Sequence, residues 1–199
     1  MRSSLLLVCF FAVSLCLFRS ASGEVSPAQD SAQHGDIEVT ASLDAAEQSG
    51  RAAGAVKIHA RPEVVWVLIT DCAESLRLVA GLELCQVLET APDRSWQLIR
   101  YVLNYSWFLP NLSCVVRATY DPPSKLTVER VSGDLRTLKG TWDLKREGDF
   151  TVVRYSVDLT TGFWVPHWLV LSALRHDLPK MLRALRARAE TIESQKPKP

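Results

Sequence analysis

Residues 161–190 read TGFWVPHWLVLSALRHDLPKMLRALRARAE, and the hydrophobic pattern of the chain changes within this stretch. Before Gly162, apolar residues recur at every second position, which is typical of β-strands. From His167 to Glu190 they recur every three or four positions, which predicts a long amphipathic helix. Pro179 lies inside this pattern, so we expect the helix to kink or to restart after Asp177. The apolar stripe of the helix comprises Trp168, Leu171, Leu174, Leu178, Leu182, Leu185 and Ala189.

The sequence before this helix predicts an antiparallel meander over residues 82–161. Alternation of period two is interrupted by short turn signals rich in Pro, Gly and Asp, which indicates five or six strands. One face of these strands is continuously apolar and aromatic, so we expect it to face the interior. That face comprises Ile99, Tyr101, Leu103, Tyr105, Trp107, Leu126, Val128, Leu138, Trp142, Val153, Tyr155, Val157 and Leu159.

One strand and two short helices are expected ahead of the meander. Residues 53–60 alternate loosely and predict the first strand. Pro62 then starts a helix. Backbone N–H groups in the first turn have no acceptor within the helix, so the N–H that proline lacks is not needed there. A second short helix is predicted from Asp71 to Val79, and Gly81 ends it.

The first 50 residues differ in character from the rest. An apolar run over residues 5–18 follows Arg2 and is shorter than the roughly 20 residues of a membrane span, which predicts a signal peptide over residues 1–23, cleaved before Glu24. An uncleaved anchor helix is the alternative. Residues 24–50 contain acids, no Lys or Arg, and few large apolar side chains, so we predict a flexible acidic leader with a short strand or helix near its end.

The composition of the chain after residue 50 predicts one globular domain over residues 51–190, followed by a disordered tail over residues 191–199. The whole chain has 23 Lys and Arg against 22 Asp and Glu, which argues against a nucleic-acid binder.

We expect a secreted or periplasmic monomer. Basic residues on the polar side of the last helix, Arg183, Arg186 and Arg188, either form a solvated face or make transient contact with an anionic membrane surface.

The predicted order of elements is that of the helix-grip fold. The stretch Ala55–Asp71, with its Pro-Glu-Val-Val-Trp motif, resembles the opening of START-like proteins of the SRPBCC superfamily, which includes polyketide cyclases and coenzyme Q-binding proteins. Gly140-Thr141-Trp142 and the stretch from Phe163 to Leu169 are similar to the final strands and helix entry of such proteins. The resemblance covers roughly 140 residues, essentially the whole predicted domain.

This resemblance implies an α+β START-like fold, in which a curved antiparallel sheet wraps around a long C-terminal helix with two short helices after strand 1. It also implies an internal cavity for a hydrophobic or amphipathic small molecule such as a lipid, sterol, quinone or polyketide. We expect a carrier or presenter of that molecule, admitted by movement of the loops near residues 78–82 and 163–166. The alternative is a cyclase or dehydratase that uses Tyr, Arg and His for proton transfer. A third interpretation is an interaction module without a working cavity.

Aromatic residues on the inward face are the main positive signal for binding, because each combines a broad apolar area with one polar group. The alternative is that these rings simply fill the core. Arg130 and Arg136 flank a predicted hairpin turn in phase with the apolar positions, so they either hold a carboxylate or phosphate in the cavity or extend to solvent. The candidate ligand-binding residues are Tyr101, Leu103, Tyr105, Trp107, Val128, Arg130, Arg136, Leu138, Trp142, Tyr155, Val157, Trp164, His167 and Leu171.

Signals for catalysis or metal binding are weak. The histidines lack a close pair or a cysteine at ligand spacing, and there is neither a Gly-rich phosphate loop nor a nucleophile elbow. We therefore predict no metal site, no cofactor and no catalytic residue. Cys72 and Cys85 flank the second short helix and form a possible disulfide, whereas Cys114 lies in an apolar strand and is expected to be a buried thiol.

Overall fold

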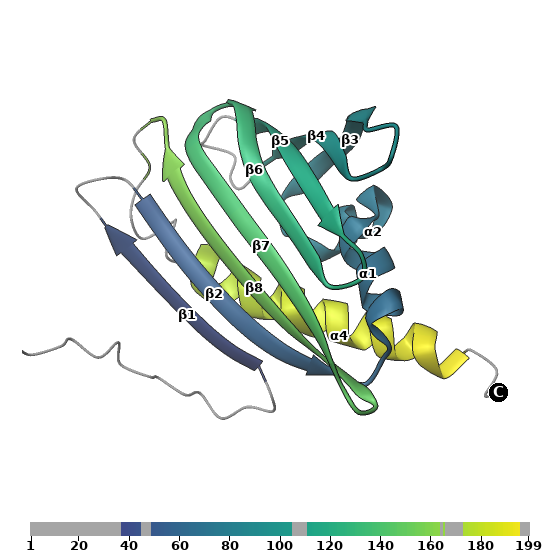
Figure 1. Cartoon of the computed structure of the whole chain (residues 1–199). Helices are drawn as coiled ribbons and strands as arrows, with labels where there is room; N and C mark the ends of the chain where they lie inside the picture. The colour runs from purple at the N-terminus through teal and green to yellow at the C-terminus, as the bar shows by residue number, and fades with distance from the viewer. Residues whose placement is uncertain (1–36, 45–48, 105–110, 164, 166–172, 196–199) are drawn as a thin grey trace, which may run out of the picture.

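The computed structural model of the 199-residue chain describes residues 37–44, 49–104, 111–163, 165 and 173–195. These residues form strands, short helices, a π-helical turn and a long C-terminal helix (Figure 1). In chain order the elements are β1 (Ile37–Asp44), β2 (Ser49–Ile58), α1 (Pro62–Thr70), α2 (Cys72–Leu78), β3 (Leu82–Thr90), β4 (Trp96–Leu103), β5 (Leu112–Asp121), β6 (Lys125–Gly133), β7 (Leu135–Glu147), β8 (Phe150–Thr161), η1 (Ala173–Asp177) and α4 (Leu178–Gln195).

The strands of the described residues form one antiparallel sheet with the order β1-β2-β8-β7-β6-β5-β4-β3. Figure 1 shows the sheet curving around α4, which crosses its concave side. The strands β3 to β8 are neighbours in chain order, so the predicted meander is confirmed with six strands. The predicted α+β helix-grip architecture is confirmed as well.

The N-terminal edge of the sheet is a strand within the second half of the predicted leader. β1 lies within the stretch predicted to be flexible, and it pairs with β2 from Ile37 opposite Val56 to Asp44 opposite Ser49. Its alternate residues pack against the core, and those between them are exposed. A strand needs only one apolar face, so a polar composition does not exclude it. The described fold therefore begins at Ile37 rather than at residue 51. The residues on the packed face are Ile37, Val39, Ala41 and Leu43.

The two short helices follow β2 as predicted. Pro62 is the first residue of α1, and its missing donor removes no helical hydrogen bond. Asp71 caps α2, since its carboxylate accepts hydrogen bonds from the backbone N–H groups of Ala73 (2.6 Å) and Glu74 (3.2 Å). Gly81, with φ of 72°, turns the chain from α2 into β3.

The C-terminal helix restarts where the proline predicted it. η1 ends at Asp177 and α4 begins at Leu178, with Pro179 in its first turn. The predicted stripe residues Leu178, Leu182, Leu185 and Ala189 are buried, while Trp168 and Leu171 lie outside the described residues. No helix in the described part of the chain is long and apolar enough to cross a membrane.

The predicted tail is wrong over residues 191–195, because α4 continues to Gln195. An ion pair between Arg61 and Glu193 (2.8 Å) holds this last part of the helix against the start of α1. The backbone N–H of His59 also donates to the Glu190 carboxylate at 3.0 Å. The apolar stripe of the helix continues at Ile192, which packs against the core, so the periodicity itself extends beyond the predicted end at Glu190.

The buried side chains form two clusters on the concave face of the sheet. The first cluster, here called the filled half, lies where α1 and α4 pack on β2 and β8. The second, here called the cavity half, is formed by β4, β5, β6 and the start of β7. Representative residues are Val56, Ile58, Val65, Leu182 and Leu185 in the filled half and Ile99, Cys114, Val116, Ala118, Leu126 and Leu135 in the cavity half.

Candidate ligand-binding cavity

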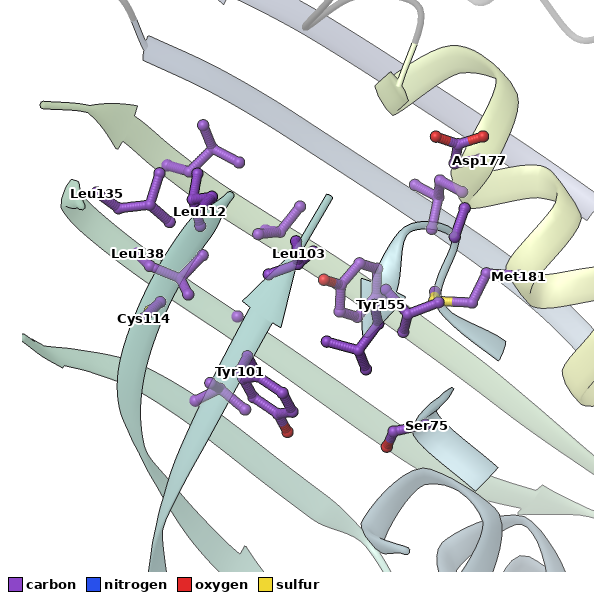
Figure 2. Close-up of a pocket in the computed structure, with 18 of the residues that line it drawn as sticks. Ser75, Tyr101, Leu103, Leu112, Cys114, Leu135, Leu138, Tyr155, Asp177 and Met181 are labelled. Carbon is purple, nitrogen blue, oxygen red and sulfur yellow. The ribbon is translucent and has the colours of Figure 1, made fainter. Parts of the chain in front are cut away.

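The concave face encloses a cavity of about 350 Å³. This volume is within the range of roughly 300–1,000 Å³ found for small-molecule sites. Its walls come from the inner faces of β4 to β8, from α2 and the loop that follows it, and from η1 and the start of α4 (Figure 2). Most of the wall is apolar, including Leu103, Leu112, Leu126, Val128, Leu135, Leu138, Trp142, Val157, Leu159, Phe163 and Met181.

A β-bulge at the start of β7 shapes one end of this wall. Leu135 and Leu138 both line the cavity although they are three residues apart, which strict alternation does not allow. The register shifts between Leu135, opposite Thr161, and Thr137, opposite Thr160. The extra residue is Arg136, and it is exposed. Of the two placements predicted for Arg136, in the cavity or extending to solvent, the structure shows the second.

Arg130 stays on the inner side of β6 but does not line the cavity. Its Nη2 donates to the carbonyl oxygen of Gly133 at 3.0 Å, so the side chain folds back along its own hairpin. Its Nε is buried and has no hydrogen-bond partner in the described structure. The guanidinium lies near Cys114, since its charge acts to lower the pKa of that thiol.

Burial dominates the electrostatics of the cavity wall. The pKa of the Tyr101 hydroxyl is raised to about 12, mainly because burial disfavours the phenolate, with smaller contributions from Tyr120 and Cys114. Burial likewise raises the pKa of the Cys114 thiol to about 11, against the opposing effect of Arg130. Both groups are therefore neutral at physiological pH, and the free thiol is a poor nucleophile.

The other polar side chains of the wall have partners nearby. The Ser75 hydroxyl donates to the backbone carbonyl of Asp71 at 2.9 Å. The Asp177 carboxylate pairs with Lys180 at 3.9 Å. The Tyr155 ring packs on Trp142 with a centroid separation of 4.3 Å, which makes an aromatic floor for the cavity.

One side of the cavity is closed by a disulfide-bonded segment, residues 72–85, here called the flap. Cys72 and Cys85 are bridged, with their Cα atoms 5.3 Å apart. The flap is further held by an ion pair between Glu74 and Arg188 of α4 (3.0 Å) and by a hydrogen bond from the Asn104 backbone N–H to the Gly81 carbonyl (2.7 Å). Four residues that line the cavity belong to the flap: Ser75, Val79, Ala80 and Leu82.

The structure brings together half of the residues predicted for the site. The residues that line the cavity are Tyr101, Leu103, Val128, Leu138, Trp142, Tyr155 and Val157. Arg130 and Arg136 do not line it. The remaining candidates, Tyr105, Trp107, Trp164, His167 and Leu171, lie outside the described residues.

Sequence reasoning missed the lining residues that come from the flap and from the helix ends. Ser75, Val79 and Ala80 carry no periodic signal, because only the tertiary fold places the flap over the sheet. Met181 lies three residues after Leu178 on the helix, so widening the predicted apolar stripe by one position would have included it.

The mostly apolar wall suits burial of an apolar guest. In the described part of the chain, no three His, Cys, Asp or Glu side chains gather as a metal site requires. Tyr101 has a pKa of about 12, far from the value suited to general acid–base catalysis near neutral pH. The described wall also carries a few polar groups, which are the hydroxyls of Tyr101, Tyr155, Ser75 and Thr161, the Cys114 thiol and the Asp177 carboxylate.

Residues 58–186 match the family model described as polyketide cyclase / dehydrase and lipid transport. Comparison with curated proteins finds no match.

Solved structures show the same fold at low sequence identity. The chain is similar to the STAR-related lipid transfer protein of Xanthomonas axonopodis, with 19% identity and a TM-score of 0.66 over 78% of this chain and 94% of that one. A human lipid transfer and protein localization domain has 16% identity and a TM-score of 0.60 over 77% of this chain and 84% of that one. The Zhui aromatase/cyclase of a Streptomyces species has 14% identity and a TM-score of 0.58 over 77% of this chain and 94% of that one.

Proposed function

This chain belongs to the polyketide cyclase/dehydrase and lipid transport family, and from this premise we propose that it binds a hydrophobic or amphipathic small molecule in the cavity and carries or presents it. The observation that carries the proposal is the cavity of about 350 Å³ with its apolar wall. A guest that buries about 250 Å² of apolar surface there gains about 6 kcal/mol, at roughly 25 cal/mol per Å². Part of this gain is offset by the entropy lost on binding.

The raised pKa values of two polar groups in the cavity wall favour a carrier over an enzyme. An enzyme that catalyses cyclisation or dehydration needs groups that exchange protons near neutral pH. The Tyr101 hydroxyl has its pKa raised to about 12, and the Cys114 thiol to about 11. The alternative function, a cyclase or dehydratase acting on a polyketide-like substrate, is supported by the fold shared with the Streptomyces aromatase/cyclase.

We further propose that the protein works after export, in a secreted or periplasmic location. The apolar run over residues 5–18 supports a cleaved signal peptide, and the bridge between Cys72 and Cys85 suits an oxidising compartment. On α4, Arg188 is engaged by Glu74, while Arg183 is exposed, so any contact with an anionic membrane would use a smaller basic surface than the sequence indicates. N-terminal sequencing of the protein made in its own host tests export, and a chain that begins at Glu24 is expected.

The binding proposal is tested by native mass spectrometry of the protein purified from its own host, combined with a variant that blocks the cavity. Gly140 lines the cavity, and a Cβ placed there would meet its neighbours at ordinary contact distances of 3.8 Å. The Gly140→Leu side chain therefore fills the cavity without displacing backbone. We expect an apolar small molecule bound to the wild type and absent from Gly140→Leu.

The matched control is Lys139→Leu, which adds the same side chain one residue earlier on β7, at an exposed position. This control should retain the bound molecule. An empty wild-type protein, or a molecule that survives in Gly140→Leu, contradicts binding in this cavity.

A further inference from the structure

Tyr101 places a phenol in the cavity wall without a hydrogen-bond partner. In Figure 2 its hydroxyl points toward the side of the cavity where α2 presents Ser75. Among the described residues, no acceptor lies within hydrogen-bond distance of this hydroxyl. The Tyr101 side chain is only partly buried and lines the cavity, so a molecule in that space can reach it. A guest in the cavity is the partner that the fold leaves room for.

The other polar groups of the described wall either have partners already or are weak hydrogen-bond donors. Ser75 already donates its proton to the Asp71 carbonyl at 2.9 Å. Tyr155 and Thr161 make other interactions, and a cysteine thiol such as Cys114 is only a weak donor. Tyr101 is thus the strong donor on the described wall that remains available to a ligand.

The charges on the described part of the wall favour an uncharged guest over an anionic one. Asp177 is the charged side chain among the described residues of the wall, and it is an acid. Arg136 is exposed. Arg130 lies outside the wall, with its Nη2 bound to the Gly133 carbonyl and its buried Nε without a partner among the described residues. A carboxylate in the cavity would lose its hydration without gaining a cation, which is strongly unfavourable.

We propose that the guest is an uncharged, apolar molecule with a carbonyl oxygen, and that this oxygen accepts a hydrogen bond from the Tyr101 hydroxyl. The inference rests on the proposed function, since it names the chemical class that the same cavity takes. Ketones, quinones and esters share this chemistry. The apolar part of the guest lies along the leucine and valine wall, and Tyr101 sets its orientation.

Three compounds with the same carbon chain test the proposal: undecane, 2-undecanone and undecanoate. Their affinities are measured by displacement of an apolar fluorescent dye at pH 8, where undecanoate is ionised. We expect 2-undecanone to bind about three- to tenfold more tightly than undecane, which is the gain from one neutral hydrogen bond. Undecanoate should bind more weakly than either.

The variant Tyr101→Phe keeps the ring and removes only the hydroxyl. It should bind undecane as well as the wild type does and lose the preference for 2-undecanone. The matched control is Tyr120→Phe, because the Tyr120 hydroxyl donates to Gln97 at 2.8 Å and lies outside the cavity wall. This control should keep the preference. Because the readout is a ratio of two affinities within one variant, partial unfolding does not alter it.

The other outcomes overturn the inference and are distinguishable from a failure of the proposed function. A preference for 2-undecanone that survives in Tyr101→Phe assigns the hydrogen bond to another donor. Undecanoate binding more tightly than 2-undecanone, with that advantage lost in Arg130→Gln, shows an anion site at Arg130 instead. Failure of all three compounds to displace the dye, or of the dye to bind, removes the proposed function together with the inference.

Discussion

Where α4 lies on β2 the concave face of the sheet is closely packed, whereas beneath the flap and the start of α4 the same sheet encloses a cavity of about 350 Å³. The packing around two glycines illustrates this difference. A Cβ on Gly54 in the filled half would lie 2.7 Å from Leu182 Cδ1, so the helix rests directly on β2. A Cβ on Gly140 in the cavity half would meet nothing closer than 3.8 Å.

The comparison shows that helix coverage, not sheet composition, decides where the fold is hollow. Both halves present apolar side chains on the concave face. The filled half receives α1 and α4 as packing partners. The cavity half is closed by the flap, whose helix α2 has no buried residue. Stability should therefore reside in the filled half and binding in the cavity half.

The largest expected difference between the halves concerns large-to-small substitutions. Leu182 is fully buried at 0% exposure, so Leu182→Ala should lower the free energy of unfolding by about 2–5 kcal/mol. Leu138→Ala should have a clearly smaller effect, because Leu138 borders a space that already exists. Equilibrium denaturant unfolding of both variants measures this difference. Equal losses would mean that the cavity half is packed as tightly as the filled half.

The second prediction concerns the bridge that closes the flap. Cys72 and Cys85 are separated by 13 residues, and a loop of this length contributes about 3 kcal/mol in the chain-entropy account. The double variant Cys72→Ser with Cys85→Ser should lose about this much stability. Hydrogen exchange should increase most in the flap and β3 and least in α4. Reductant should destabilise the wild type and leave the double variant unchanged, and a reductant effect on the double variant would contradict this assignment.

A smaller effect is expected at alkaline pH, and it tests burial in the cavity half. Tyr101 has a folded-state pKa of about 12 against an ordinary value of 10.0. Because the folded state holds this proton more tightly, its contribution to stability is complete below pH 10 and is lost as the pH rises through 12. By pH 11 the loss from this one group should be about 1 kcal/mol.

The measurement compares unfolding of the wild type and Tyr101→Phe at pH 8 and at pH 11. The wild type should lose about 1 kcal/mol more than the variant between these two values. An equal loss in both proteins would show that the Tyr101 hydroxyl ionises as freely in the folded state as in the unfolded chain.

Local patterns predicted most of the fold and part of the cavity wall. The inward positions Tyr101, Leu103, Val128 and Trp142 follow from strand alternation, which is a property of neighbouring residues. The restart of the helix at Leu178 follows from the geometry of proline. The polar but alternating sequence of β1 allowed only the prediction of a short strand or helix near the end of the leader, without its place in the sheet.

These limits share one physical cause, which is that the local pattern does not contain the contacts of distant residues. Alternation placed Arg136 in phase with the inward Leu138 and left its direction open, but a bulge in the register between β7 and β8 turns it outward. Composition predicted a tail after Glu190, but Arg61 and His59 hold the helix beyond it.

The amino-acid sequence alone determined the six-strand meander, the paired short helices and the buried stripe of α4, because hydrogen-bond geometry and the spacing of apolar residues are set along the chain. Only the tertiary structure decided that α4 fills one half of the concave face and leaves the other hollow. It also decided that the disulfide-bonded flap closes that space and that Tyr101, rather than either arginine, presents the available donor. These features depend on which elements pack together, and such contacts join residues far apart in the sequence.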